Sequence, residues 1–273
     1  MLRSLNTAVS GLQYQQNRLD VIGNNIANVN TTGFRAATTH AADSFSSMLN
    51  SRAQIGSGVS TAGVSNSFTQ GVIAGTGQPY DMAIQGNGFF VVKDSVTGES
   101  FATRAGDFRL DTSGFLVTQD GYRVQGLDSA GAAGDIKITL NPANLPGGSS
   151  GVSWQIANDG KVMLTLASTV SGTPAPAPIQ IGQIQVQNFS DPGALTKVGS
   201  NRFSNLDGAG PSGLGTPGTG GRGDIKWQAL EQANVDLASQ FTDLIVTQRG
   251  YQANAKIITT SDEILQELIN LKR

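Results

Sequence analysis

The sequence of 273 residues contains no cysteine and only one histidine, His40. The absence of cysteine excludes disulfide bonds, thiol catalysis and thiolate metal sites. A single histidine argues against a histidine-based metal site and against a Ser-His-Asp triad. Charged residues make up only 14% of the chain and the formal net charge is −2, so nucleic acid is not expected as the main partner. These absences disfavour an enzyme, and no cofactor or metal is expected.

Long hydrophobic runs are also missing from the sequence. No segment approaches the 18 or so consecutive apolar residues that cross a membrane, so membrane insertion is not expected. The first 20 residues lack the continuous apolar stretch of a cleavable signal peptide. Export by a route that reads another signal stays open.

Proline and glycine are concentrated in the middle of the chain. All nine prolines lie between Pro79 and Pro217, and only Gly250 follows residue 223 among the 35 glycines. Helix interiors exclude both residue types. The sequence therefore predicts two helical ends around a turn-rich middle.

About 25 residues at the start of the chain carry a helical pattern in which apolar residues recur at alternating intervals of three and four, as in a coiled-coil seam. The seam consists of Leu2, Leu5, Val9, Leu12, Leu19, Ile22 and Ile26. An asparagine-rich segment follows, and Asn and Gly favour the conformation that closes a helix. The helix is therefore expected to end between Asn28 and Gly33.

The C-terminal end carries a longer seam with the same spacing, and Asn234 or Asp236 is expected to cap its helix. The seam consists of Leu237, Phe241, Leu244, Tyr251, Ile258, Leu265 and Ile269. The polar residues Gln16, Gln248 and Asp262 also occupy seam positions, which is unusual for a deep core. The two helices are expected to pack on each other, on neighbouring copies, or on both.

In the middle of the chain, the sequence predicts about eight to ten short strands, which would form an irregular sandwich or barrel-like domain. The expected fold is therefore mainly β, with long terminal α-helices that pair as a coiled coil. We expect a helical assembly domain at 1–34 and 230–273, an extended arm at 35–78, and a β-rich domain at 79–229. The last contains a glycine-rich loop at 208–223.

Short motifs in the sequence offer no chemistry. Gly86-Asn87-Gly88 lacks the later glycine and the helix of a dinucleotide site, and a bulge or close backbone approach suits it better. Arg222-Gly223-Asp224 matches an adhesive tripeptide but lies in a glycine-rich loop. An adhesin therefore remains a minor alternative.

Three ordered blocks of sequence resemble the bacterial flagellar rod and hook proteins. The first runs from Ser10 to Phe34, the second from Asp81 to Phe108, and the third from Val246 to Glu263. The residues that carry this resemblance include Asn24, Asn25, Asn28, Gly33, Phe34, Gly86, Gly88, Phe89, Gln248 and Arg249. The likeness extends over nearly the whole chain.

The resemblance implies a subunit of the flagellar axis that polymerises helically around a central channel. In this family the terminal helices form an inner tube and the β-rich part faces outward. Export through the flagellar type III apparatus, without a cleaved signal, is implied, and so is a location outside the cell or in its envelope. The implied partners are further copies of the chain, adjoining rod and hook–filament junction proteins, a hook cap and the export apparatus.

The closing residues 259–273 and the segment 54–59 are most similar to hook proteins. A hook subunit, part of a flexible joint that transmits torque from rod to filament, is therefore the favoured expectation. A chain of 273 residues is short for many hooks and close to the distal rod protein. The distal rod, a rigid drive shaft, is the alternative.

Overall fold

The computed structural model describes residues 2–44, 46–50, 53–128, 131–138, 149–168 and 178–271. The chain divides into two compact units. We call them the helical unit (Met1–Val29, Arg35–Ser67 and Val235–Arg273) and the β unit (Asn30–Phe34 and Phe68–Asn234). The expected fold class is confirmed, because a mainly β central part is flanked by N- and C-terminal helices that contact each other.

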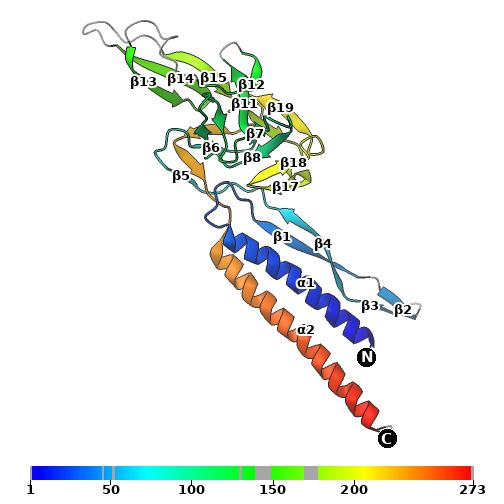
Figure 1. Ribbon diagram of the computed structural model, residues 1–273. Coiled ribbons are helices and arrows are strands. Elements are labelled where there is room, and N and C mark those ends of the chain that lie inside the picture. The colour runs from blue at the N-terminus through cyan, green and yellow to red at the C-terminus, as the bar shows by residue number, and fades with distance from the viewer. Residues whose placement is uncertain are drawn as a thin grey trace. The chain divides into compact units, whose positions relative to one another are not determined.

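Two long antiparallel helices dominate the helical unit (Figure 1). Helix α1 spans Leu2–Ala27 and helix α2 spans Leu237–Leu271. Asp236 caps α2, because its Oδ1 accepts a hydrogen bond of 3.0 Å from the backbone N–H of Ala238. None of the described helices is long and apolar enough to cross a membrane.

A β-hairpin accompanies α1 in the helical unit (Figure 1). Its strands β1 (Ala37–Asp43) and β4 (Val59–Asn66) pair antiparallel. Strands β2 (Ser46–Asn50) and β3 (Ala53–Gly56) pair with each other between them. The sequence predicted an extended arm here, and the structure shows that much of this segment is paired.

Polar side chains of α1 fix the hairpin. Asn17 Nδ2 donates to Thr61 Oγ1 at 3.1 Å, and Ser10 Oγ accepts from the backbone N–H of Val59 at 3.3 Å. Strands that are held by polar contacts need no alternation of hydrophobic and polar residues. Hydrophobic periodicity therefore could not predict these strands.

Among the described residues, the β unit is built on one branched sheet of 13 strands whose longest path is β13-β14-β15-β11-β7-β8-β18-β17. These strands are β13 (Ser149–Ile156), β14 (Lys161–Ser168), β15 (Ile179–Ile184), β11 (Arg123–Asp128), β7 (Phe89–Lys93), β8 (Ser100–Thr103), β18 (Arg202–Ser204) and β17 (Thr196–Gly199). Shorter strands branch from it: β9 (Arg109–Leu110), β10 (Leu116–Val117), β12 (Ala133–Asp135), β16 (Val186–Phe189) and β19 (Pro211–Gly215). Strand β19 lies inside the segment that was expected to be a glycine-rich loop.

Two small antiparallel pairs complete the β unit. Strand β20 (Asp224–Trp227) pairs with β6 (Met82–Gln85), and β21 (Ala229–Glu231) pairs with β5 (Ile73–Gly75). A short 3-10 turn occupies Pro192–Ala194.

The two faces of β7 pack into different hydrophobic cores. Phe90 and Val92 belong to the larger core, and Phe89 belongs to the smaller one. The larger core also contains Met82, Ile84, Phe108, Leu116, Val124, Ile136, Val162, Ile184, Val186 and Ile225. This alternation is the period of two that a strand buried on both faces requires.

Candidate assembly site

Small residues bring α1 and α2 close together in the helical unit. A Cβ atom built on Gly11 would lie 2.7 Å from Asn254 Nδ2, and one built on Gly250 would lie 2.6 Å from Gln15 Nε2. The absence of a side chain at each glycine therefore makes room for an amide on the facing helix.

Polar groups also join the two helices. Arg18 Nη2 lies 2.8 Å from Asp243 Oδ1, and Asn25 Nδ2 donates to Gln240 Oε1 at 3.0 Å. Asn25 is buried and exchanges two hydrogen bonds with the backbone of Ala37 in β1. One asparagine thus connects α1, α2 and the hairpin.

A row of polar residues runs along the side of α2 that contacts α1, next to the half-buried Leu244, Ile258 and Leu265. The row consists of Gln240, Thr247, Asn254 and Ser261, which repeat every seven residues; Thr247 and Ser261 are buried. We call these four residues the polar stripe. The sequence analysis missed the stripe because it sought a heptad repeat in apolar residues, although the spacing itself was visible.

The structure divides the expected apolar seam into covered and exposed residues. The only fully buried residue among the described seam side chains is Ile22. The half-buried ones are Leu5, Leu12, Leu19, Ile26, Leu244, Ile258 and Leu265, and the exposed ones are Val9, Leu237, Phe241, Tyr251 and Ile269. The side chain of Leu2 lies outside the described part. Part of the seam therefore serves the chain's own packing, and part is open in the isolated chain.

Helix α2 presents apolar side chains on both sides of the polar stripe. At about 100° per residue, two sets lie roughly 80° to either side of the stripe. The first flank consists of Leu237, Phe241 and Tyr251, and the second flank consists of Val246, Ile257 and Ile264. Their side chains are 39–56% exposed, which makes the two flanks the candidate assembly surface.

The N-terminal signature has structural roles at the end of α1. Asn28 Nδ2 donates to the backbone O of Asn24 at 2.9 Å and to its Oδ1 at 2.7 Å, which closes the helix. In the β unit, Asn201 Nδ2 donates to Thr32 O at 2.6 Å, and Thr103 Oγ1 donates to Asn201 O at 2.9 Å. The segment after α1 is thereby anchored in the β unit.

Gly33 and Phe34 complete this anchor. Gly33 has φ +68°, its N–H donates to Glu231 O at 2.8 Å, and a Cβ there would lie 2.5 Å from the backbone N of Ala105. Phe34 is buried, and Lys197 Nζ lies 4.3 Å from the centre of its ring. Only glycine satisfies both the backbone conformation and the space at position 33.

The central signature also depends on glycine. Gly86 and Gly88 have φ +114° and +124°. A Cβ on Gly86 would lie 3.0 Å from the backbone of Gly223, and one on Gly88 would collide with the side chain of Val186. The expected close backbone approach is confirmed, and Phe89 directly after it enters the smaller core.

Two of the residues that carry the C-terminal signature have exposed side chains. Gln248 and Arg249 are both exposed on α2. Arg249 Nη1 donates to Gln252 Oε1 at 3.2 Å, one turn along the same helix. These residues are therefore available to other molecules.

The Arg-Gly-Asp tripeptide is engaged within the β unit. Arg222 Nη2 donates to the backbone O of Ser212 at 3.1 Å and of Gly213 at 2.9 Å. Gly223 is buried and its N–H donates to Asn87 O. The arginine thus holds the loop to β19, an arrangement that offers the adhesin alternative no support.

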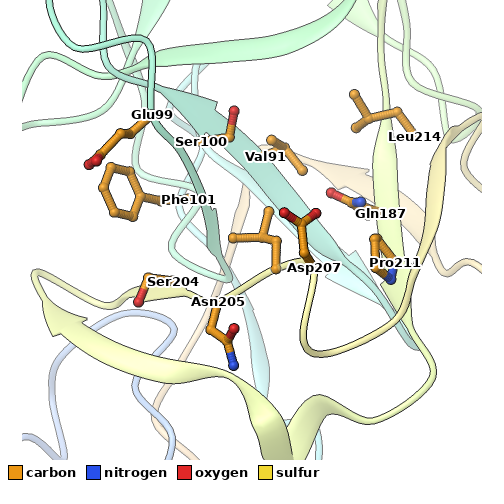
Figure 2. Close-up of a pocket in the computed structure, with 11 residues that line it drawn as sticks. Val91, Glu99, Ser100, Phe101, Gln187, Ser204, Asn205, Asp207, Pro211 and Leu214 are labelled. Atoms are coloured by element: carbon orange, nitrogen blue, oxygen red, sulfur yellow. The ribbon is translucent and has the colours of Figure 1, made fainter.

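A cavity of about 610 Å³ in the β unit is lined in part by β7 and β8 (Figure 2). Figure 2 shows Glu99 and Phe101 on one side of it and Gln187 and Leu214 on the other. Its described lining contains two serines and two carboxylates but no histidine, lysine or arginine. Among the described residues no group of three or more His, Cys, Asp or Glu side chains could hold a metal ion.

A second cavity, of about 180 Å³, contains Asp107. Burial raises the pKa of the Asp107 carboxyl above its ordinary value of 3.8, and the nearby carboxylates of Asp81 and Asp120 raise it further. A hydrogen bond from its own backbone N–H opposes part of this shift. The folded protein therefore disfavours the charged form of Asp107.

We expect Asp107→Asn to stabilise the β unit at pH 7, because the variant removes a buried charge. A folded-state pKa above the unfolded value means that wild-type stability falls as the pH rises from below 3.8 through the folded pKa. The gain in unfolding free energy should therefore be largest at pH 7 and shrink as the pH falls toward 3.8. Urea unfolding of both proteins across this range measures it, and a gain that stays constant with pH would contradict the assignment.

Three family models match the chain, in the order of the three signature segments. "Flagella basal body rod protein" matches residues 5–35, "Flagellar hook protein FlgE/F/G D1 domain" matches 83–164, and "Flagellar basal body rod FlgEFG protein C-terminal" matches 228–271. The flagellar basal-body rod protein FlgG of Bacillus subtilis (strain 168) is 41% identical over the full length of both chains. The chain belongs to the flagellar rod and hook family.

Other members of the FlgE/F/G family are also similar over their whole length. FlgG of Caulobacter vibrioides is 35% identical over 99% of this chain and all of the relative. The flagellar hook protein FlgE of Borreliella burgdorferi is 28% identical and is fully covered, in an alignment of 443 positions. The chain is thus a structural protein of the flagellar axis and not an enzyme.

Proposed function

We propose that this chain is the subunit of the distal rod, the alternative that the sequence analysis placed second to the hook. The supporting observation is the match in length. The alignment with FlgG of Bacillus subtilis needs 289 positions for the 273 residues, whereas the alignment with the hook protein needs 443. The additional sequence of that hook protein has no counterpart here.

The helical unit supports a rigid role. The hairpin of β1 and β4 lies against α1 and is joined to it through Asn17 and Asn25. A helix pair braced by a hairpin resists bending better than two helices alone, because bending must also shear the hairpin contacts. Bracing of this kind suits a drive shaft.

In this proposal the two flanks of α2 bind neighbouring copies. Within one chain α2 uses its polar stripe and the half-buried Leu244, Ile258 and Leu265 for packing, while both flanks remain exposed for helices of other subunits. A contact between different surfaces of identical subunits repeats without closing a dimer and generates a helical polymer. The apolar side chains of the two flanks are exposed in the isolated chain, so burying them against neighbouring copies would add stability to the helices on assembly.

The proposed partners follow from this position in the axis. They are further copies of the chain, the adjoining rod and hook proteins, a cap at the growing end, and the flagellar type III export apparatus. The proposed location is the rod of the basal body in the cell envelope.

Electron microscopy of basal bodies from cells that lack this chain tests the proposal. Because axial structures are continuous, loss of a distal rod subunit should give a shortened rod without a hook. Re-expression of the chain should restore both structures. A rod of full length that lacks only its hook would contradict the proposal and favour the hook.

A further inference from the structure

The last residue of β21, Glu231, has a fully buried side chain that binds three other segments of the β unit. Its Oε2 lies 3.2 Å from Nη1 of Arg104, and its Oε1 accepts a hydrogen bond of 2.8 Å from the backbone N–H of Gly71. Its backbone carbonyl accepts a hydrogen bond of 2.8 Å from the N–H of Gly33. We call Gly33, Gly71, Arg104 and Glu231 the clasp.

Arg104 attaches the clasp to the sheet of β6. The side chain of Arg104 is 4% exposed, and its Nη2 donates to Gly86 O at 2.8 Å. Gln70 reinforces the same place, because it donates to Ile84 O at 3.1 Å and accepts from the N–H of Gly86 at 3.0 Å. The charged pair is therefore held at both ends by backbone groups.

Most of the clasp residues lie, in the sequence, close to the points where the chain passes between the two units. The polypeptide passes between the helical unit and the β unit at residues 29–30, 34–35, 67–68 and 234–235. On the β-unit side these ends are joined to one another: Asn234 Nδ2 donates to Thr69 O and to Thr69 Oγ1, each at 3.0 Å. The backbone N–H of Asn234 also donates to Phe34 O at 3.4 Å, and that of Gln232 donates to Val72 O at 2.9 Å.

We propose that the clasp has a mechanical role: through its buried Arg104–Glu231 pair, it holds together the β-unit ends of these four connections. Tension carried by the polypeptide between the units must enter the β unit through segments that the clasp joins. The clasp therefore spreads the tension over β5, β6 and β21 and keeps any single strand from peeling away. This inference deepens the proposed role as a drive shaft, because it names the residues through which torque passes from one unit to the other.

A buried ion pair suits this task through specificity more than through stability. Replacing such a pair by apolar side chains is often neutral, whereas removing one partner leaves an uncompensated buried charge. If β21 were displaced, the buried charge of Arg104 would lose its compensation by Glu231. The clasp consequently opposes slippage of β21 more strongly than apolar packing would, since apolar contacts tolerate a shift in register.

Hydrogen exchange of the monomeric Glu231→Gln variant tests the proposal. Glutamine can still accept from Gly71 but cannot neutralise Arg104. We expect the amide protection of Gly33, Gly71 and Gln232 to fall by about 100-fold or more, while Val92 and Ala102 in the core change little. An equal loss at all five amides, or less than about a threefold loss at the first three, would overturn the proposal.

Asp135→Asn is the matched control, because it removes the same kind of charge from the Arg123–Asp135 pair in the same unit. That pair has a distance of 2.9 Å, and its side chains are 31% and 27% exposed, so water compensates the loss. The protection of the Gly33, Gly71 and Gln232 amides should not change in this control. A fall equal to that in Glu231→Gln would show a general electrostatic effect and would overturn the proposal.

The wild-type monomer provides a second measurement that needs no variant to fold. In native-state exchange at increasing denaturant, Gly33, Gly71 and Gln232 should open with one shared free energy. Three unrelated opening free energies would contradict the clasp. Both measurements use the monomer, so failure of the clasp is distinguishable from failure of the distal-rod assignment.

Discussion

Phe241→Asp and Ile264→Asp will each prevent polymerisation and leave the monomer folded. Phe241 lies on the first flank of α2 and Ile264 on the second, and each side chain is 49% exposed in the isolated chain. A neighbouring helix would bury both, and an unpaired carboxylate buried in an apolar contact costs several kcal/mol. Since about 1.4 kcal/mol corresponds to a tenfold change, the critical concentration for assembly should rise by about 100-fold or more.

Lys256→Asp is the control for this experiment, because Lys256 is exposed and lies nine residues after Thr247, about 180° around α2 from the polar stripe and away from both flanks. It should assemble like the wild type. Sedimentation of polymers over a concentration series measures all three variants, and circular dichroism confirms that the monomers are folded. Normal assembly of Phe241→Asp would remove the first flank from the interface, and normal assembly of Ile264→Asp would remove the second.

Leu244 and Ile258 belong to the same expected seam but give a less direct test. Both are half-buried in the isolated chain, so a charge there would also disturb the packing of α2 within its own unit. Loss of assembly by these variants would therefore not distinguish a disturbed helical unit from a broken contact between subunits.

Gly33→Ala will destabilise the β unit by about 2–4 kcal/mol. The methyl group would lie 2.5 Å from the backbone N of Ala105 and 2.7 Å from the carbonyl C of Arg104, and neither backbone atom can rotate away. The backbone at φ +68° is also strained for alanine. Urea unfolding followed by tryptophan fluorescence measures the effect, because both tryptophans of the chain, Trp154 and Trp227, pack against the larger core of the β unit.

Two glycines in the same unit separate strain from collision. Gly77 has φ +70° with open space around its Cβ position, so Gly77→Ala should show the conformational cost alone, about 1–2 kcal/mol. Gly134 has open space and no positive φ, so Gly134→Ala should stay within about 0.5 kcal/mol of the wild type. Equal losses for Gly33→Ala and Gly77→Ala would show that the collision at Gly33 is relieved.

The sequence predicted the two terminal helices because their signals are local. Proline is absent from both ends, and Asp236 caps α2 as one of the two expected residues. The turn at Asn158-Asp159-Gly160 also depends on neighbouring residues, and Gly160 has φ +80° between β13 and β14. A cap or a tight turn can be predicted because the residues that form it are adjacent in the chain.

The face by which the helices meet could not be predicted from hydrophobicity. A heptad search assigns the seam to leucine and isoleucine, whereas Thr247 and Ser261 are the buried residues of α2. Their hydroxyls donate to the backbone of Asp243 and Ile257 within the helix, which permits burial of a small polar side chain. The exposed apolar positions of the two flanks then remain available for other helices.

Residues held by distant partners were also missed. The hairpin depends on polar side chains of α1, and Glu231 depends on Arg104, which lies 127 positions away in the chain. A glutamate near the end of a strand is ordinarily exposed, and nothing adjacent to Glu231 indicates that it is buried. Such residues become visible only when the fold brings their partners together.

Electron microscopy of tubes assembled from the purified chain tests the distal-rod proposal most directly. The length match and the braced helical unit predict straight, stiff tubes, and seeding with rod fragments should give the same form. Tubes that curve smoothly, or that change curvature along their length, would contradict the distal-rod assignment and restore the hook.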